Sequence, residues 1–173
     1  MPSLQSNDFE LFGVPQQFAQ DSSLLAARWK DLQRQAHPDQ FSAQDASAQR
    51  LAMQWSVRIN EAYQRLKDPL KRATYLCELQ GVPIDAHTNT AMPAAFLMQQ
   101  IEWREALDAL RSADDALQLQ TQVNHQRQER LARCATLLDS AGQPQEAAQE
   151  VRALMFIARF AQELEQQLDE LEQ

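Results

Sequence analysis

Apolar residues recur every three or four positions along most of the chain, and short segments rich in proline, glycine or aspartate interrupt this spacing. Recurrence at three and four positions places apolar side chains on one face of an α-helix. β-branched residues are few, and no segment alternates apolar and polar residues in the manner of a strand. The pattern therefore predicts an all-α fold.

Two helices are predicted before the first long break in the pattern. A single apolar turn over residues 7–12 ends at Gly13, a residue type that often closes helices because it adopts left-handed backbone angles without strain. The second helix has its N-cap at Asp21 or Ser22 and ends before His37, because a following proline disfavours the α conformation. Its apolar seam consists of Leu25, Trp29, Leu32 and Ala36.

Two further helices follow in the first half of the chain. A capping-box pattern of Ser42 and Asp45 opens a long helix that extends to the residue before Asp68. Asp68 and Pro69 are in register as N-cap and first helical residue of the next helix, which stops near Gly81. We expect the two long helices to pair antiparallel. The apolar stripe of the second long helix consists of Leu51, Trp55, Ile59, Ala62 and Leu66.

Turn-forming residues divide the pattern into two domains. We assign a first domain, a segment of helix end and linker, and a second domain to residues 1–76, 77–92 and 93–173. Three helices in the second domain are expected to form a three-helix bundle, at residues 93–111, 113–139 and 144–172. The core stripe of the last helix is predicted to be Leu154, Ile157, Ala161, Leu164, Leu168 and Leu171.

Charge is distributed unevenly between the two halves. Residues 1–76 carry 9 Lys and Arg against 8 Asp and Glu, whereas residues 77–173 carry 7 against 16. The second half should repel nucleic acid and anionic membranes and attract basic partners. No segment reaches the roughly 18 apolar residues of a membrane span, and the N-terminus has no basic leader. We expect a cytoplasmic protein that binds neither nucleic acid nor membranes.

The two cysteines do not suggest metal chemistry. Cys77 and Cys134 each stand alone in a helical segment, without Cys or His at the spacing of a metal site. Two thiols also fall short of the usual four thiolates of an iron–sulfur cluster. We therefore expect buried free thiols, no bound metal and no cofactor.

The tripeptide His37-Pro38-Asp39 lies in the short break between the two long helices. Proline fixes its own φ and turns the preceding histidine outward, so the loop presents a ring and a charge to a partner. On the helix before it, Lys30 and Arg34 project away from the apolar seam and Arg28 flanks the seam. Exposed basic side chains of this kind would steer an acidic partner surface.

The helix at 93–111 has apolar residues on two opposite faces. One face contains Phe96, Trp103, Leu107 and Leu110 and should pack in the bundle, with Trp103 in the core. The other face contains Ala94, Leu97, Met98 and Ile101 and is rimmed by Glu102 and Glu105. A three-helix bundle cannot bury both faces, so the second face is predicted to bind a partner, and the alternative is contact with the first domain. Phe156 and Phe160 on the last helix could extend this face.

Residues 7–76 resemble a J domain, the module of DnaJ-type co-chaperones. The order of the elements matches, and the motifs that carry the resemblance are residues 8–14, 37–39, 59–69 and 71–75. The resemblance implies that His37, Pro38 and Asp39, with the basic face of the preceding helix, bind a DnaK-type chaperone and stimulate its ATPase. An aspartate on a rigid turn suits a charge-assisted pair with a partner arginine.

Three positions depart from the usual J-domain pattern. Asp31 stands where many J domains have a basic residue, Ala36 replaces the usual aromatic residue, and Gln40 follows the tripeptide where a basic residue is common. These departures predict a specialised DnaK-type partner rather than the general one.

Almost the whole chain resembles the HscB-type co-chaperones of iron–sulfur cluster assembly. Residues 31–39 and 95–105 are similar to the two signatures of that family. The resemblance implies a protein without catalytic residues that presents an IscU-type scaffold to an HscA-type chaperone. The scaffold-binding residues that it implies are Leu97, Met98, Ile101, Glu102, Arg104, Glu105 and Phe156.

Two other functions are compatible with parts of the sequence. The closer alternative is a J-domain adaptor that presents a different client protein to a DnaK-type chaperone. An enzyme that uses His37 and Asp39 as an acid–base pair is disfavoured, because we expect the two side chains to point apart and find no nucleophile pattern beside them.

Overall fold

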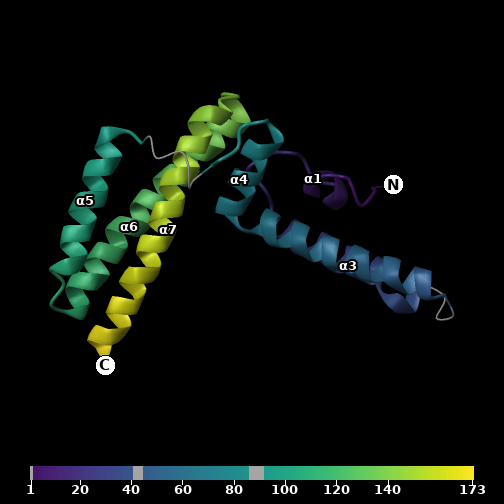
Figure 1. Cartoon of the computed structure of the whole chain (residues 1–173), viewed down its shortest axis with the longest axis horizontal. Helices are drawn as coiled ribbons and strands as arrows, with labels where there is room; N and C mark the ends of the chain where they lie inside the picture. Colours follow the sequence, from purple (N-terminus) through teal and green to yellow (C-terminus); the bar gives the residue numbers. More distant parts are fainter. Residues whose placement is uncertain (1, 41–44, 86–91) are drawn as a thin grey trace. The chain divides into compact units, whose positions relative to one another are not determined.

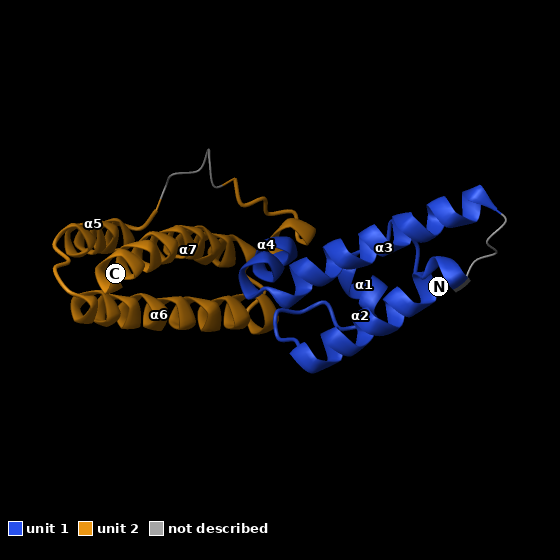
Figure 2. Cartoon of the chain, turned by 90° about the horizontal axis from the view of Figure 1, so that it is seen from below, with its two compact units in different colours: residues 1–76 blue, residues 77–173 orange. Residues whose placement is uncertain are grey.

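The computed structural model describes residues 2–40, 45–85 and 92–173, and this part of the chain is helical without any strand (Figure 1). It divides into two compact units, unit 1 at residues 1–76 and unit 2 at residues 77–173 (Figure 2). The all-α prediction is confirmed. Ser42 and residues 86–91 of the predicted linker lie outside the described residues.

Unit 1 begins with α1 (Asp8–Phe12) and α2 (Ser22–Ala36), whose predicted caps are confirmed. Asn7 and Glu10 form a capping box at the start of α1, and Gly13 closes the helix with φ 62°. The Asp21 carboxylate accepts hydrogen bonds from the first backbone amides of α2. Both ends of α1 and the start of α2 are therefore determined by local sequence.

The long helix α3 (Ala46–Lys67) and α4 (Pro69–Leu79) follow a short 3₁₀ turn, η1 (Pro38–Gln40). Asp45 is the N-cap of α3. Asp68 accepts hydrogen bonds from the first backbone amides of α4, as the Asp68-Pro69 pair predicts. The predicted end of α3 and start of α4 are thereby confirmed. The predicted start of α3 needs correction, because Asp45 is the N-cap of the helix itself rather than the acidic partner within its first turn.

Helices α2 and α3 pair antiparallel, as predicted. Trp29 Nε1 and Gln33 Nε2 both donate to Asn60 Oδ1, at 2.9 and 2.7 Å, and Gln33 Nε2 also reaches the Ser56 carbonyl at 3.4 Å. Trp29 stacks on Tyr63 with ring centroids 5.1 Å apart. The fully buried core residues of unit 1 include Phe9, Phe12, Leu25, Ile59, Leu66 and Leu76.

One member of the predicted α3 stripe is not in the core. Leu51 is exposed, and its neighbour Ala52 is fully buried in its place. At about 100° per residue, Leu51 lies roughly 80° from the direction of Ile59, whereas Ala52 lies within about 20° of it. A stripe counted in steps of four drifts away from the face that packs, and this drift explains the error.

A buried ionic cluster holds α1 against α3. The Asp8 side chain is fully buried, with Arg58 Nη1 at 2.7 Å and Arg65 Nε and Nη2 at 2.6 and 3.0 Å. The Asp8 backbone amide donates to the Tyr75 hydroxyl at 3.0 Å. The hydrogen bond with Asp8 raises the pKa of Arg65. Paired arginines are what makes a fully buried carboxylate tolerable.

Unit 2 contains α5 (Ala94–Asp108), α6 (Ala113–Ala135) and α7 (Pro144–Glu172), with a π-helical turn η2 (Thr136–Ser140) between the last two. The three predicted helices are confirmed with adjusted ends, since α5 stops at Asp108 and α6 passes into the π turn. The core residues are Trp103, Leu107, Ala116, Leu119, Val123, Ile157, Phe160, Leu164 and Leu168.

The end of the predicted α7 stripe needs correction. Leu171 is 37% exposed, because it is the last residue but one of the helix, where few neighbouring residues remain to cover it. The other large apolar members of the stripe, Leu154, Ile157, Leu164 and Leu168, are buried. The seam therefore ends one turn earlier than the sequence predicts.

Both cysteines are free and buried within unit 2, as predicted. Burial raises the pKa of Cys77 to about 11 and that of Cys134 to about 12. Both thiols are therefore protonated and unreactive at neutral pH. Among the described residues, no helix is long and apolar enough to cross a membrane, and no group of three His, Cys, Asp or Glu could hold a metal ion.

Candidate functional site

The histidine–proline–aspartate tripeptide is exposed at the end of the α2–α3 hairpin. The helix α2 ends at Ala36, and His37 leaves it in an extended conformation with φ −60° and ψ 136°. Pro38 then begins the 3₁₀ turn. The His37 and Asp39 side chains are 60% and 87% exposed. Since both local conformations follow from the proline, the tripeptide forms an outward-facing turn whose backbone is restricted by the proline ring.

The expectation that His37 and Asp39 point apart is wrong. His37 Nδ1 lies 3.4 Å from Asp39 Oδ2 and accepts the Asp39 backbone amide at 3.2 Å. The tight 3₁₀ turn brings residues two positions apart onto one side of the loop. This contact orients the imidazole ring, while the Asp39 side chain stays largely exposed to solvent.

The three predicted basic residues of α2 do not share one face. Lys30 and Arg34 are exposed on the side of α2 that also carries Gln33, the residue bonded to α3. Arg34 forms a surface ion pair with Asp31 at 3.4 Å. The Arg28 guanidinium lies beside Gly13 at the end of α1. Its Nη1 atom is 3.9 Å from the position that a Cβ atom would have on that glycine. Arg28 is therefore separated from the other two.

Ala36 is buried at the end of α2 and borders an apolar cleft of about 390 Å³. Leu32 and Trp55 also line this cleft. The small side chain at this position leaves space between α2 and α3 directly behind the loop.

The helix α5 exposes the predicted apolar face to solvent. Leu97, Met98 and Ile101 are 43%, 62% and 59% exposed, whereas Phe96 and Trp103 on the opposite face are 3% and 5% exposed. Glu102 and Glu105 are exposed beside the apolar residues. We call the set Leu97, Met98 and Ile101 the α5 face. No described contact within unit 2 covers it, so the face is available to a partner.

Arg104 marks the edge of the α5 face that lies next to α7. Its guanidinium forms a bidentate ion pair with Glu163, with Nη2 and Oε1 3.1 Å apart. It also lies over the rings of Phe156 and Phe160, 5.9 and 5.5 Å from their centroids. The hydrogen bond with Arg104 holds the pKa of Glu163 below its ordinary value. The arginine predicted as a binding residue is thus also a bridge between two helices.

The two phenylalanines of α7 differ in burial. Phe156 is half-buried and meets Phe96 edge-on at 5.7 Å. Phe160 is fully buried and stacks on Trp103 at 5.4 Å, so the expectation that it extends the exposed face is wrong. At about 100° per residue, Phe160 lies only about 60° from Ile157, which is close enough to the seam to pack in the core.

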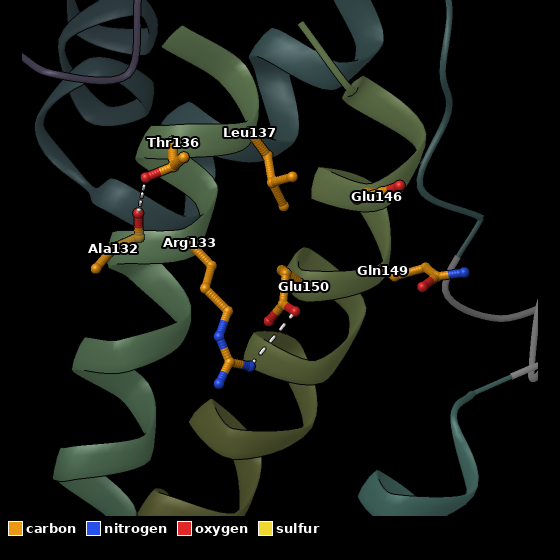
Figure 3. Close-up of a pocket in the computed structure, with 7 residues that line it drawn as sticks. All are labelled: Ala132, Arg133, Thr136, Leu137, Glu146, Gln149 and Glu150. Atoms are coloured by element: carbon orange, nitrogen blue, oxygen red, sulfur yellow. Dashed lines mark hydrogen bonds and ion pairs between the residues drawn. The ribbon is translucent and has the colours of Figure 1, made fainter. Parts of the chain in front are cut away.

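A concave surface of unit 2 lies where α6 passes into η2. This open cleft of about 650 Å³ is lined by Ala132, Arg133, Thr136, Leu137, Glu146, Gln149 and Glu150 (Figure 3). Glu150 faces Arg133 at 3.7 Å and pairs more closely with Arg130 at 2.8 Å. Glu150 is therefore paired with two arginines, and the lining contains a second acidic residue, Glu146.

Comparison with known proteins identifies the family. Residues 92–165 match the family model described as the HSCB C-terminal oligomerisation domain. The chain is 50% identical to the Co-chaperone protein HscB homolog of Burkholderia multivorans and 47% identical to that of Paraburkholderia phytofirmans, with 99% of each chain covered in both cases.

Solved structures agree with these relatives. Chaperone HscB from Vibrio cholerae matches with a TM-score of 0.82 at 38% identity, over 96% of this chain and 99% of that one. Human co-chaperone protein HscB has the same fold, with a TM-score of 0.90 at 24% identity over 96% of this chain and 84% of that one.

The class that these features define is a two-part helical co-chaperone, with an N-terminal J domain and a helical C-terminal domain. The chain belongs to the HscB family of co-chaperones. The resemblance noted in the sequence is thereby confirmed for the family and for the fold.

Proposed function

We propose that this protein delivers an IscU-type iron–sulfur scaffold to an HscA-type DnaK-family chaperone and stimulates its ATPase during cluster assembly and transfer. Membership in a family of co-chaperones supports the role in general terms. The observation that carries the specific proposal is the pair of exposed surfaces of different chemistry, one on each unit. A charged loop on unit 1 suits the chaperone, and the apolar α5 face on unit 2 suits the scaffold.

The chaperone is proposed to bind His37, Pro38 and Asp39. Asp39 is almost fully exposed and is held by a rigid turn, so pairing with a partner arginine would cost little conformational entropy. Lys30 and Arg34 steer the acidic partner toward the loop. Arg28, the third basic residue predicted to contact the chaperone, lies apart from these two beside Gly13 and would contact it only at the edge of the interface. Stimulation arises because binding favours the chaperone conformation that hydrolyses ATP faster, so this chain needs no catalytic group.

The scaffold is proposed to bind the α5 face. Its three apolar side chains are the central contacts, because buried apolar residues dominate most interfaces. Glu102 and Glu105 form an acidic rim that selects a partner with basic residues around an apolar patch. The remaining proposed contacts, Arg104 and Phe156, lie at the border with α7.

The chaperone half of the proposal is tested by His37→Gln in a steady-state ATPase assay with the purified chaperone. We expect stimulation to be lost while the melting temperature and scaffold binding stay unchanged, because the side chain is exposed and distant from the core. The matched control is His125→Gln, which changes an exposed histidine of α6 that pairs with Glu129 on the same helix. Stimulation that survives in His37→Gln would remove the tripeptide from the mechanism.

The scaffold half is tested by combining Leu97→Ala, Met98→Ala and Ile101→Ala in calorimetric titration against the scaffold. Interface hot spots contribute roughly 1–2 kcal/mol or more each, so we expect the affinity to fall by several kcal/mol in total. The control combines Leu117→Ala and Leu171→Ala, two exposed apolar residues outside the α5 face. A large drop in melting temperature with unchanged affinity would show that the face packs within the protein.

A further inference from the structure

Besides the α5 face of unit 2, the protein exposes a pair of apolar residues on helix α3 of unit 1. Met53 and Val57 are 64% and 56% exposed and lie one helical turn apart. They form one side of a shallow cleft of about 340 Å³ that Gln54, Arg58 and Glu61 complete. The core of unit 1 uses the opposite side of α3, so this pair has no role in folding the hairpin.

Met53, one member of the pair, lies on the side of α3 that faces the basic residue Lys30 of α2. Met53 and Asn60 are seven residues apart, so they project within about 20° of each other. Asn60 Oδ1 accepts the hydrogen bond from Gln33 at 2.7 Å, and Gln33 lies one turn after Lys30. Met53 therefore lies on the flank of α3 next to α2, on the side of Lys30. Val57 projects about 40° further toward solvent, so the cleft extends across the outer side of α3 to Arg58, which with Arg65 contacts α1.

The pair is also level with the tripeptide along the hairpin axis. Gln33 reaches the backbone of Ser56, and the helices run antiparallel. Moving three residues onward along α2 reaches Ala36, while moving three residues back along α3 reaches Met53. The exposed methionine therefore lies beside the loop that begins at His37, and η1 itself packs on α3.

We infer that Met53 and Val57 are the apolar anchor of the chaperone-binding surface, an inference that rests on the proposed function. The occupant is a patch of apolar side chains on the DnaK-type chaperone, bordered by the acidic residues that Lys30 and Arg34 attract. Charged residues at the rim of an interface act mainly on the rate of encounter. Residence time depends on apolar side chains that lose water at the centre, and this pair is adjacent to the loop.

A second copy of the chain is a poorer occupant for this surface. A two-fold symmetric contact would place the same patch on both sides. The basic residues Lys30 and Arg34 of each copy would then approach one another, and like charges across an interface are unfavourable. Charge complementarity instead favours an acidic partner.

The test measures chaperone binding kinetics and ATPase stimulation for Met53→Ser with Val57→Ser. We expect the dissociation rate to rise about tenfold or more with an unchanged dependence on salt, because no charge is altered. Lys30→Glu with Arg34→Glu should instead slow association and flatten its salt dependence. The single variant Met53→Ser is compared with Leu24→Ser as its matched control. Leu24 is an apolar residue, 41% exposed, in the first turn of α2 and away from the loop.

The outcomes separate this inference from the proposed function. Unchanged dissociation in the double variant, together with loss of stimulation in His37→Gln, would overturn the apolar anchor and leave the chaperone role intact. Survival of stimulation in His37→Gln would instead contradict the proposed function itself. The apolar anchor would also be overturned if Leu24→Ser raised the dissociation rate as much as Met53→Ser does. It would likewise be overturned if the wild type were a dimer that Met53→Ser with Val57→Ser dissociates without any change in chaperone binding.

Discussion

In each unit one helix packs against a pair of antiparallel helices, α1 against α2 and α3 in unit 1 and α5 against α6 and α7 in unit 2. The contacts that hold this helix differ in chemistry between the two units. In unit 1, α1 is held to α3 by a fully buried carboxylate, Asp8, between Arg58 and Arg65. In unit 2, α5 is held to α7 by aromatic rings, and the ion pair of Arg104 and Glu163 lies at the surface, with both side chains nearly half exposed. The same bond type is central in one unit and peripheral in the other.

Burial explains why these two ionic contacts should differ in energetic weight. Removing one partner of a buried ion pair leaves an uncompensated charge in a medium that solvates it poorly. At the surface, water and salt replace much of a lost interaction. Unit 1 should therefore depend strongly on its ionic cluster, whereas unit 2 should depend mainly on its aromatic core.

The difference also suits the two proposed surfaces. In unit 1 the binding loop lies between the long helices, so α1 can be fixed rigidly without covering it. In unit 2 the binding surface is the outer side of the fastened helix itself. Holding α5 by its inner aromatic residues, Phe96 and Trp103, leaves Leu97, Met98 and Ile101 exposed.

The largest expected effect comes from Asp8→Asn. An amide in place of this carboxylate leaves Arg58 and Arg65 without their shared counter-ion, and we expect unit 1 to lose roughly 3–5 kcal/mol of stability. Denaturant unfolding followed by hydrogen exchange of peptides from each unit would measure it. Asp31→Asn, at an exposed pair with Arg34, is the matched control and should change little. A loss below about 1 kcal/mol for Asp8→Asn would contradict the contrast between the units.

Much of the fold could be predicted because its determinants are local. Caps at Asp21 and Asp68, the closing residue Gly13 and the three-to-four spacing of apolar residues involve neighbours within one or two helical turns. The exposure of the α5 face also follows from one helix, since a second apolar side cannot pack in a three-helix bundle.

The features that could not be predicted depend on residues distant in sequence. Asp8 looks like an ordinary first-turn acidic residue until α3 brings to it two arginines that are 50 and 57 positions away in sequence. Likewise, Phe160 lies about 60° from Ile157 on α7, and its burial is completed by Trp103, a residue distant in sequence that stacks on it. The contact of His37 with Asp39 is local, yet it depends on the 3₁₀ turn, and a sequence pattern did not distinguish that turn from an open loop.

A smaller effect is expected from Phe160→Leu in unit 2. Leucine stays apolar but loses the stacking on Trp103 and Phe156, and we expect a loss of about 1–2 kcal/mol of stability. Phe156→Leu should cost less, because that ring is half-buried. Chemical denaturation with the exchange of unit 2 peptides as the probe compares them. Equal losses of stability in the two variants would mean that the buried ring of Phe160 contributes no more to the aromatic core of unit 2 than the half-buried ring of Phe156.

The smallest effect is expected from Glu163→Gln, which removes the surface ion pair with Arg104. We expect at most about 1 kcal/mol, because the pair is solvent-exposed, and the loss should shrink further in high salt. The pKa of Glu163 is lowered in the folded protein. Its contribution is therefore present above the ordinary pKa of a glutamate and disappears as the pH falls through the lowered value.

Glu163→Gln should accordingly differ from the wild type at neutral pH and converge with it in acid. Melting temperatures at several pH values would show this convergence, and a double-mutant cycle with Arg104→Gln would isolate the pair from other titrating groups. A difference of several kcal/mol that persists at high salt would place this ion pair in the same class as the Asp8 cluster. The contrast between the two units would then fail, because the exposed ion pair of unit 2 would contribute as much stability as the buried ionic cluster of unit 1.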